Sequence, residues 1–106
     1  MTQIAYTVTA TLPDEATARE YVSWLEGGHI DAVISRGARS AMIVRLDPEP
    51  ADPPGPIQVE VRYIFATREL FDRYVAVHAP TLRADGLQRF GPSRGIQFAR
   101  RIGTIL

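Results

Sequence analysis

The sequence predicts an α+β domain in which a strand–helix–strand unit is used twice, giving the order βαββαβ. Three observations support this prediction: four strand-length segments with alternating apolar residues, two longer stretches with helical periodicity, and an internal similarity at an offset of 49 positions. A chain of 106 residues buries roughly two-thirds of its unfolded surface, which suffices for one modest core. Residues 1–106 are therefore expected to form a single domain.

The first, third and fourth strands are predicted from period-two alternation, which places one face of each strand in the core. Residues 4–12 and 57–65 alternate most cleanly, and the expected core-facing residues are Ile4, Tyr6, Val8, Ala10, Leu12, Val59, Val61, Tyr63 and Phe65. Near the end of the chain, Ile96, Phe98 and Ile102 indicate a final strand, with Arg100 and Arg101 close to its end.

The second strand is predicted over residues 40–47. Its alternation gives two possible faces, and we expect Met42, Val44 and Leu46 to face the core, with Ala41, Ile43 and Arg45 on the outer face. Residues 47–56 follow and contain five prolines, which exclude a helix and a strand ladder. This segment is therefore an exposed connection between two strands.

The first helical arm begins near Pro13, Asp14 and Glu15, because a first helical turn accepts proline and favours acidic side chains. Gly27-Gly28 weakens this arm, and Gly37 is a natural end. Residues at helical spacing form one apolar stripe, and its members are Ala18, Val22, Leu25, His29 and Val33.

The second arm begins at Thr67, whose hydroxyl is a suitable N-cap, and places His78 at the end of its apolar stripe. Pro80 interrupts this arm, so Thr81 to Asp85 is expected to form a short separate helical piece that ends at Gly86. With this element order, two helices cover one face of a four-stranded antiparallel sheet, which is the ferredoxin-like arrangement.

The internal similarity relates the two arms. An offset of 49 positions aligns Arg19-Glu20 with Arg68-Glu69, His29 with His78, and Gly37 with Gly86. Such pseudo-symmetry is expected when one βαβ unit is used twice. It implies that a shared structural reason can explain both histidines, at positions where each helix weakens or kinks.

Composition excludes several functional classes. The absence of cysteine excludes disulfides, thiolate metal sites and cysteine nucleophiles. The start of the chain has no secretory signal pattern and no apolar run of membrane-spanning length, so a soluble, cytoplasmic protein without membrane partners is expected. The formal charge is zero, and all basic residues are arginine without interleaved exposed aromatics, which argues against nucleic-acid binding. No motif predicts a metal site or a cofactor.

Several short motifs resemble those of the dimeric α+β-barrel superfamily, and more closely those of a bacterial family of domains of unknown function within it. These motifs are Trp24-Leu25, His29-Ile30, His78-Ala79-Pro80 and Arg89-Phe90-Gly91. Asp31 stands where the family commonly has proline, so the first arm is expected to kink less sharply. The superfamily includes antibiotic-biosynthesis monooxygenases, muconolactone isomerase and small ether-degradation-associated proteins. The resemblance implies a homodimer with face-to-face sheets, and it implies no established activity.

The expected outer face of the sheet supports a homodimer independently. Two helices cover only one face, and the other combines Ala41, Ile43 and Ile64 with Thr7, Thr9, Glu60, Arg62 and Arg45. Such a mixed surface suits pairing with a second copy around a twofold axis, with Glu60 pairing with Arg62 or Arg45. An ordinary solvated face is the alternative.

His78 and His29 are the candidate catalytic residues, because only histidine titrates naturally near neutral pH. One interpretation places each at the mouth of a cleft between helix and sheet, with aromatic walls for a flat organic ligand formed by Tyr6, Trp24, Tyr63 and Tyr74. In the other interpretation each histidine packs beside a kink and has only a structural role. Asp85 is expected to cap a turn and Arg83 to be solvated, so neither forms a dyad with His78.

Arg100 and Arg101 point to opposite faces of a regular strand, so one of them should face the core or a cavity. That arginine would hold a carboxylate or phenolate of a ligand. The alternative is an intramolecular pair with Glu60 or with the chain terminus at Leu106. Two functions are compatible with these features. The first is a small-molecule-binding homodimer, such as a cofactor-independent oxygenase or isomerase, and the second is a non-catalytic dimeric module for assembly or regulation.

Overall fold

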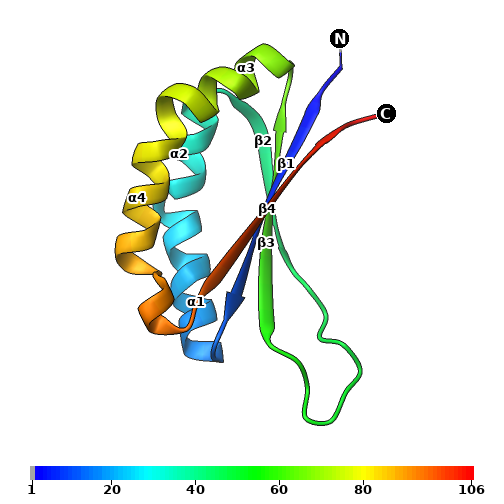
Figure 1. Ribbon diagram of the computed structural model, residues 1–106, viewed down its shortest axis with the longest axis vertical. Coiled ribbons are helices and arrows are strands. Elements are labelled where there is room, and N and C mark those ends of the chain that lie inside the picture. Colours follow the sequence, from blue (N-terminus) through cyan, green and yellow to red (C-terminus); the bar gives the residue numbers. More distant parts are fainter. Residues whose placement is uncertain (1) are drawn as a thin grey trace.

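The computed structural model describes residues 2–106 and contains one four-stranded antiparallel sheet with all major helices on one face (Figure 1). The strands are β1 (Ile4–Leu12), β2 (Ala38–Arg45), β3 (Ile57–Phe65) and β4 (Gln97–Thr104). Their spatial order is β2-β3-β1-β4. The first strands of the two βαβ units, β1 and β3, therefore lie at the centre of the sheet. The predicted α+β, ferredoxin-like βαββαβ fold is confirmed.

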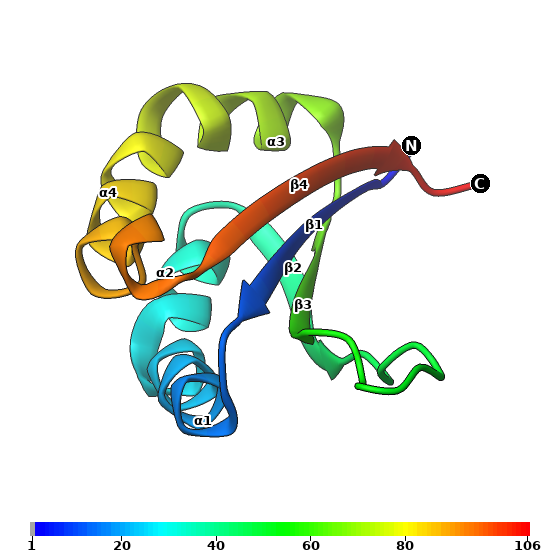
Figure 2. The ribbon, with the colours of Figure 1, turned by 60° about the horizontal axis from the view of Figure 1, so that its bottom comes forward.

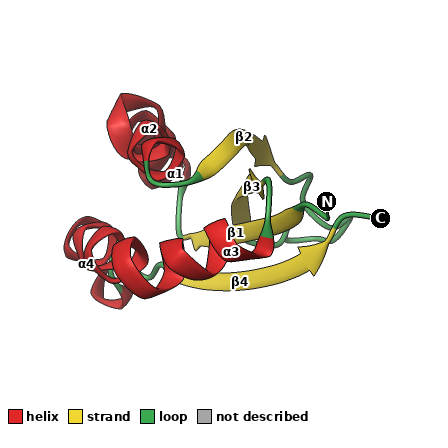
Figure 3. Ribbon diagram, turned by 90° about the horizontal axis from the view of Figure 1, so that it is seen from above, coloured by secondary structure: helices red, strands yellow, loops and turns green. Residues whose placement is uncertain are grey.

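Each helical arm consists of two α-helices joined by a π-helical turn. The first arm contains α1 (Glu15–Trp24), the π turn η1 (Leu25–His29) and α2 (Ile30–Ser35). The second contains α3 (Arg68–Arg73), the π turn η2 (Tyr74–His78) and α4 (Ala79–Arg89), and a short 3₁₀ turn, η3 (Pro92–Arg94), leads into β4. The first arm lies on the β2 side of the sheet and the second on the β4 side (Figure 3).

Both arms begin at side-chain N-caps. Asp14 Oδ1 accepts a hydrogen bond from the Thr17 amide at 2.8 Å, and Thr67 Oγ1 accepts one from the Leu70 amide at 3.2 Å. These bonds satisfy amides that the first helical turn leaves without a partner. The predicted starts of both arms are thus explained by local hydrogen bonding.

The two π turns lie 49 positions apart and each ends at a histidine, as the internal similarity predicts. The strands β1 and β3 begin 53 positions apart instead, because α3 is four residues shorter than α1. The similarity at 49 positions therefore relates all of α3 to the last six residues of α1, and continues through the π turns. The second arm lacks about one helical turn at its start.

The core fills the space between the arms and the sheet and is rich in aromatic rings. Phe65 on β3 is fully buried and contacts Phe71 and Tyr74 of the second arm, with ring centroids 5.2 and 5.3 Å apart. Tyr6 on β1 stacks on Tyr63 of β3 at 5.9 Å. The contacts of Phe65 hold the start of the second arm, α3 and η2, against β3.

The predicted faces of the second strand are wrong. Pairing with β3 sets Ala41 opposite Tyr63 and Ile43 opposite Val61, so Ala41 and Ile43 face the helices, while Met42 lies outside and is 59% exposed. A register irregularity between Ala38 and Ser40 shifts the alternation. One extra residue in a strand moves every following side chain to the other face, and sequence alternation alone does not reveal it.

The corrected register also moves Arg45 to the helical side, where it forms two hydrogen bonds with Glu15 of α1, at 2.6 and 2.7 Å. The outer face keeps its predicted mixed character, with Met42, Val44, Ile64, Thr7, Thr9, Glu60, Arg62 and Arg101. On this face Arg62 pairs with Glu60 at 2.6 Å, as expected. No element of the described residues covers this face (Figure 1).

The segment 46–56 forms the connection between β2 and β3 and projects away from both helical arms (Figure 2). Most of its residues are exposed, as its proline content predicts. None of the helices in the described part of the chain has the length and apolarity needed to cross a membrane.

The end of the second arm differs from its prediction. Residues 79–89 form one helix, α4, in which Pro80 occupies the first turn and Gly86 lies inside. A Cβ atom at Gly86 would lie 3.3 Å from Trp24 Cη2, so the glycine permits close contact with the first arm rather than ending a helix. Asp85 pairs with Arg89 at 3.6 Å and does not cap a turn.

Gly28 has φ 145° within η1, a conformation that L side chains rarely adopt, although a Cβ atom there would meet no neighbour within 4 Å. We therefore predict that Gly28→Ala lowers the free energy of unfolding by about 1–3 kcal/mol through backbone strain alone. Gly27→Ala is the matched control, because Gly27 has no positive φ and equal free space. Urea denaturation measures the free energy of unfolding of both variants. Equal values for the two would contradict the prediction.

Candidate functional site

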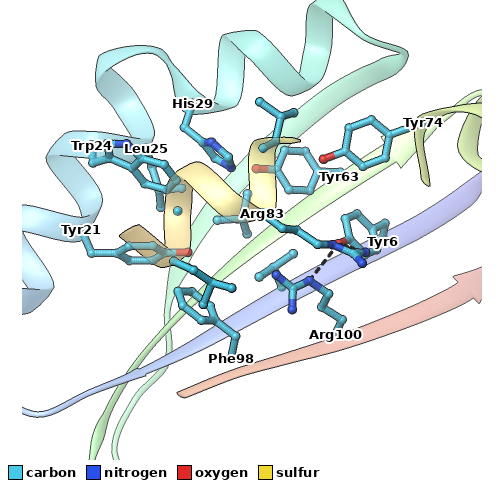
Figure 4. Close-up of a pocket in the computed structure, with 15 residues that line it drawn as sticks. Tyr6, Tyr21, Trp24, Leu25, His29, Tyr63, Tyr74, Arg83, Phe98 and Arg100 are labelled. Atoms are coloured by element: carbon cyan, nitrogen blue, oxygen red, sulfur yellow. Dashed lines mark hydrogen bonds between the residues drawn. The ribbon is translucent and has the colours of Figure 1, made fainter. Parts of the chain in front are cut away.

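A cavity of about 50 Å³ lies between the helical arms and the inner face of the sheet (Figure 4). Its walls come from β1, α1, η1, β3, η2, α4 and β4. They include four tyrosines, a tryptophan, a histidine and two arginines: Tyr6, Tyr21, Tyr63, Tyr74, Trp24, His29, Arg83 and Arg100. The cavity is thus largely aromatic, with polar groups at defined places.

Trp24 and His29 form one wall. Their rings stack with centroids 4.0 Å apart and an angle of 22° between planes. In an α-helix of 3.6 residues per turn, residues five apart point about 140° away from each other. The π turn brings them to the same side, since its hydrogen bond, from the Ile30 amide to the Leu25 carbonyl, spans five residues. The π turn therefore builds this wall.

Burial lowers the pKa of His29 to about 4, and the nearby negative charge of Asp85 opposes this shift only in part. The imidazole is consequently neutral at pH 7. Within residues 2–106 neither ring nitrogen has a hydrogen-bond partner, so His29 presents a free acceptor and a free donor. A neutral histidine beside a cavity can accept a proton from a bound molecule.

Three tyrosine hydroxyls border the cavity without a hydrogen-bond partner among the described residues, and they belong to Tyr21, Tyr63 and Tyr74. Burial raises the pKa of Tyr21 and of Tyr74 to about 12, and it raises the pKa of Tyr63 further. All three therefore stay protonated and can donate hydrogen bonds. Unpaired hydroxyls in an aromatic enclosure need water or a ligand as partner.

The fourth tyrosine, Tyr6, joins two arginines. Arg83 Nη2 and Arg100 Nε each donate a hydrogen bond to Tyr6 Oη, both at 3.2 Å (Figure 4). Arg83 was expected to be solvated, but α4 directs it inward and its Nε is buried without a partner. Arg100 lies partly in solvent and packs its guanidinium over the Phe98 ring, 5.9 Å from the centroid.

The structure brings most predicted site residues together. Tyr6, Trp24, His29, Tyr63, Tyr74 and Arg100 all line the cavity. His78 and Arg101 do not. His78 ends the equivalent π turn but stays half-buried outside the cavity, and Arg101 lies on the outer face opposite Thr7. Their proposed roles as a catalytic and a ligand-binding residue remain predictions without support from this cavity.

Several lining residues were not predicted, chiefly Tyr21, Arg83, Gly86 and Phe98. Spacing contained a signal for three of them. Tyr21 lies three positions after Ala18 and four before Leu25, which is helical spacing. With residues 79–89 taken as one helix, Ala79, Arg83 and Gly86 share a face, but Pro80 suggested an interruption instead.

Among residues 2–106, no three His, Asp or Glu side chains lie close enough to hold a metal ion. The polar groups of the cavity are mainly donors: guanidinium groups and tyrosine hydroxyls. They suit the oxygen atoms of an organic molecule rather than a cation.

Solved structures with the same fold are distant in sequence. An ethyl tert-butyl ether (EthD) family protein from Bacillus halodurans has a TM-score of 0.73 at 12% identity, with 100% of both chains covered. A dimeric ferredoxin-like protein from an uncultured marine organism has a TM-score of 0.72 at 14% identity, covering 100% of this chain and 97% of that one.

A third structure is SnoaB, described as a cofactor-independent oxygenase from Streptomyces nogalater, with a TM-score of 0.58 at 11% identity. The match covers 98% of this chain and 91% of SnoaB. At these identities the likeness shows the fold alone. No curated protein matches the sequence.

The family comparison is more specific than the structural ones. The sequence profile of a domain of unknown function, DUF4286, matches residues 3–103, which include every strand core, both π turns and the whole cavity lining. This confirms the resemblance to a family of domains of unknown function with this fold. The chain belongs to the DUF4286 family.

Proposed function

We propose that this protein binds a small oxygen-bearing organic molecule in the cavity between its helical arms and its sheet. The observation that supports this most is the set of three unpaired tyrosine hydroxyls, carried by largely buried side chains, that border an unfilled space. A cavity needs about 10–15 Å³ to hold one water, so 50 Å³ accommodates a few atoms.

The size of the cavity limits the ligand. A cavity of about 150 Å³ is needed to hold benzene, three times the space present here. A flat aromatic ligand would require movement of residues at the mouth, such as Leu87 and Arg100, both exposed. A compact molecule, or one end of a longer one, fits without such movement.

Proton transfer is the chemistry that this arrangement supports. Neutral His29 would take a proton from a carbon or hydroxyl of the ligand, and tyrosine hydroxyls would donate hydrogen bonds to the oxygen that gains negative charge. Returning the proton to another carbon completes an isomerisation without a cofactor. Loss of a proton from carbon also gives a carbanion that dioxygen, as a second substrate, could oxidise; SnoaB, which has this fold, is described as a cofactor-independent oxygenase.

A homodimer is the expected assembly. The outer face of the sheet is uncovered and includes the apolar Met42, Val44 and Ile64 among paired polar residues. A second copy would cover this face around a twofold axis. The dimeric ferredoxin-like relative supports this proposal.

The alternative is a non-catalytic dimeric module in which His29 and the tyrosines complete the core. The small volume of the cavity favours this alternative, and ligand binding distinguishes the two.

Filling the cavity should abolish binding. Val8 lines it from β1, and Val8→Phe places a ring there. In the parent protein, acetone, acetate or acetylacetone, each added alone, should shift the NMR signals of the Trp24 indole and the His29 ring. Val8→Phe should remove these shifts, whereas Val77→Phe, at an exposed position outside the cavity, should keep them. Circular dichroism verifies folding. If no probe shifts the parent signals, the non-catalytic module is correct.

The His29 pKa gives a direct test of its environment. Burial disfavours the charged ring, so an NMR titration should show one histidine with a midpoint near 4. Because this folded-state pKa lies below the unfolded value of about 6.5, protonation favours unfolding, and His29 lowers the stability as the pH falls from about 6.5 towards 4. His29→Gln should weaken this pH dependence and identify the signal. A His29 midpoint of 6.5 or above would show a solvated ring.

The dimer proposal predicts a concentration-dependent assembly that the outer face controls. Met42→Asp should give a monomer by light scattering at micromolar concentration, because it buries a charge in the interface. Val77→Asp is a matched control, since Val77 is 58% exposed on the helical side and Met42 is 59% exposed. A parent protein that is monomeric, or equal effects of both variants, would exclude this interface.

A further inference from the structure

The cavity ends at an unusual meeting of two cations. Arg83 from α4 and Arg100 from β4 both donate to the same tyrosine oxygen, that of Tyr6, at 3.2 Å (Figure 4). Two guanidinium groups around one neutral oxygen repel each other. Such an arrangement gains stability when an anion lies between them.

Both hydrogen bonds at Tyr6 Oη are donated to it by arginines. A phenolic oxygen has two acceptor lone pairs, and the two arginines occupy both at Tyr6. The Tyr6 proton is therefore available for an acceptor outside the described residues. Arg83 Nε is also buried and without a partner, although an unsatisfied buried charged donor costs more than a neutral one.

No acidic side chain balances these two arginines. The ion pairs of the described residues involve Arg45, Arg62, Arg89 and Arg94, each with its own Asp or Glu. Asp85 lies two residues after Arg83, yet it pairs with Arg89 on the exposed side of α4. The protein thus leaves two positive charges at the cavity without an internal counterion.

We propose that Arg83, Arg100 and the Tyr6 hydroxyl form a carboxylate-binding site, and that Arg83 is the residue that makes the cavity select an anion. A carboxylate offers four acceptor positions in a plane, which match the free N–H groups of a guanidinium and a phenolic proton. This inference rests on the proposed function, because it specifies the ligand of the same cavity as a compact carboxylic acid.

The position of the site orients such a ligand. Tyr6 and the arginines lie at one side of the cavity, and Trp24 and His29 lie across it (Figure 4). A carboxylate held at the arginines directs the rest of the molecule toward the neutral imidazole. Carboxylic acids of few non-hydrogen atoms are the class that fits about 50 Å³.

The experiment compares acetate with acetamide, which has the same shape and no charge. Each is titrated into the full-length protein at constant ionic strength set with chloride, and NMR shifts of the Trp24 indole and His29 ring give the dissociation constants. Acetate should bind at least about tenfold more tightly than acetamide, since hydrogen bonds to charged groups contribute more than neutral ones.

Three variants assign the effect to the site. Arg83→Gln and Arg100→Gln should each weaken acetate binding by about tenfold and leave acetamide unchanged. Arg101→Gln is the matched control, because it removes the same charge from the neighbouring residue on the outer face. It should change acetate binding less than twofold. Arg100 is exposed, so Arg100→Gln retains the fold even if the loss of Arg83 perturbs α4.

Two results overturn the inference while leaving the proposed function intact: equal binding of acetate and acetamide at the cavity, or an equal loss in Arg101→Gln, which would indicate only net charge. If neither acetate, acetamide nor acetone shifts the cavity signals, the proposed function fails together with the inference.

Discussion

Each helical arm must change the set of residues that faces the sheet partway along its length, and a π turn makes this change in both arms. The turn inserts one residue into the hydrogen-bond ladder, so side chains five apart come to the same side. In the first arm this aligns Trp24 with His29. In the second arm it buries Tyr74 against Phe65 and leaves His78 at the margin. Without these turns, the aromatic side chains that enclose the cavity would diverge from one another.

The cavity persists because its walls cannot close around it. Aromatic rings have few rotamers, and neighbouring rings hold one another: Tyr21 contacts Trp24, Phe90 and Phe98 at centroid distances of 5.3 to 6.0 Å. Gly86 lets α4 approach Trp24 so closely that a Cβ atom at this position would lie 3.3 Å from the indole ring. The hydroxyls of Tyr21, Tyr63 and Tyr74 would lose hydrogen-bonding partners if the space collapsed. Rigid packing and polar groups together keep the space open, which distinguishes it from a packing defect.

Features that depend on a few adjacent residues are predicted correctly from the sequence, and features that depend on contacts between distant segments are not. The alternation of apolar residues correctly predicts β1, β3 and the face of each that lies in the core. The capping residues correctly predict where both helical arms begin. The faces of β2 depend on an irregularity at Ala38 and Ser40 that only pairing with β3 defines. The inward position of Arg83 is not evident from the sequence, because Pro80 is compatible both with a break and with the first turn of one helix, which it occupies in α4. The two histidines were equivalent in sequence, and only the packing of Trp24 against His29 separates their environments. The cavity residues on different elements could be suggested individually by residue type, but their convergence required the fold.

Charge gives the two sides of the cavity distinct chemical characters. His29 is neutral through burial, so the net positive charge lies with Arg83 and Arg100 on the other side. The proposed carboxylate would balance one guanidinium and leave the other without a counterion. If His29 then takes a proton from the bound molecule, the negative charge that develops on the ligand's oxygen is stabilised by this second guanidinium and by the tyrosine hydroxyls. A protonated His29 in turn gains a favourable interaction with Asp85, which already opposes the effect of burial on its pKa. Both charges created by the proposed proton transfer would thus meet an existing opposite charge, as the proposed acid–base chemistry requires.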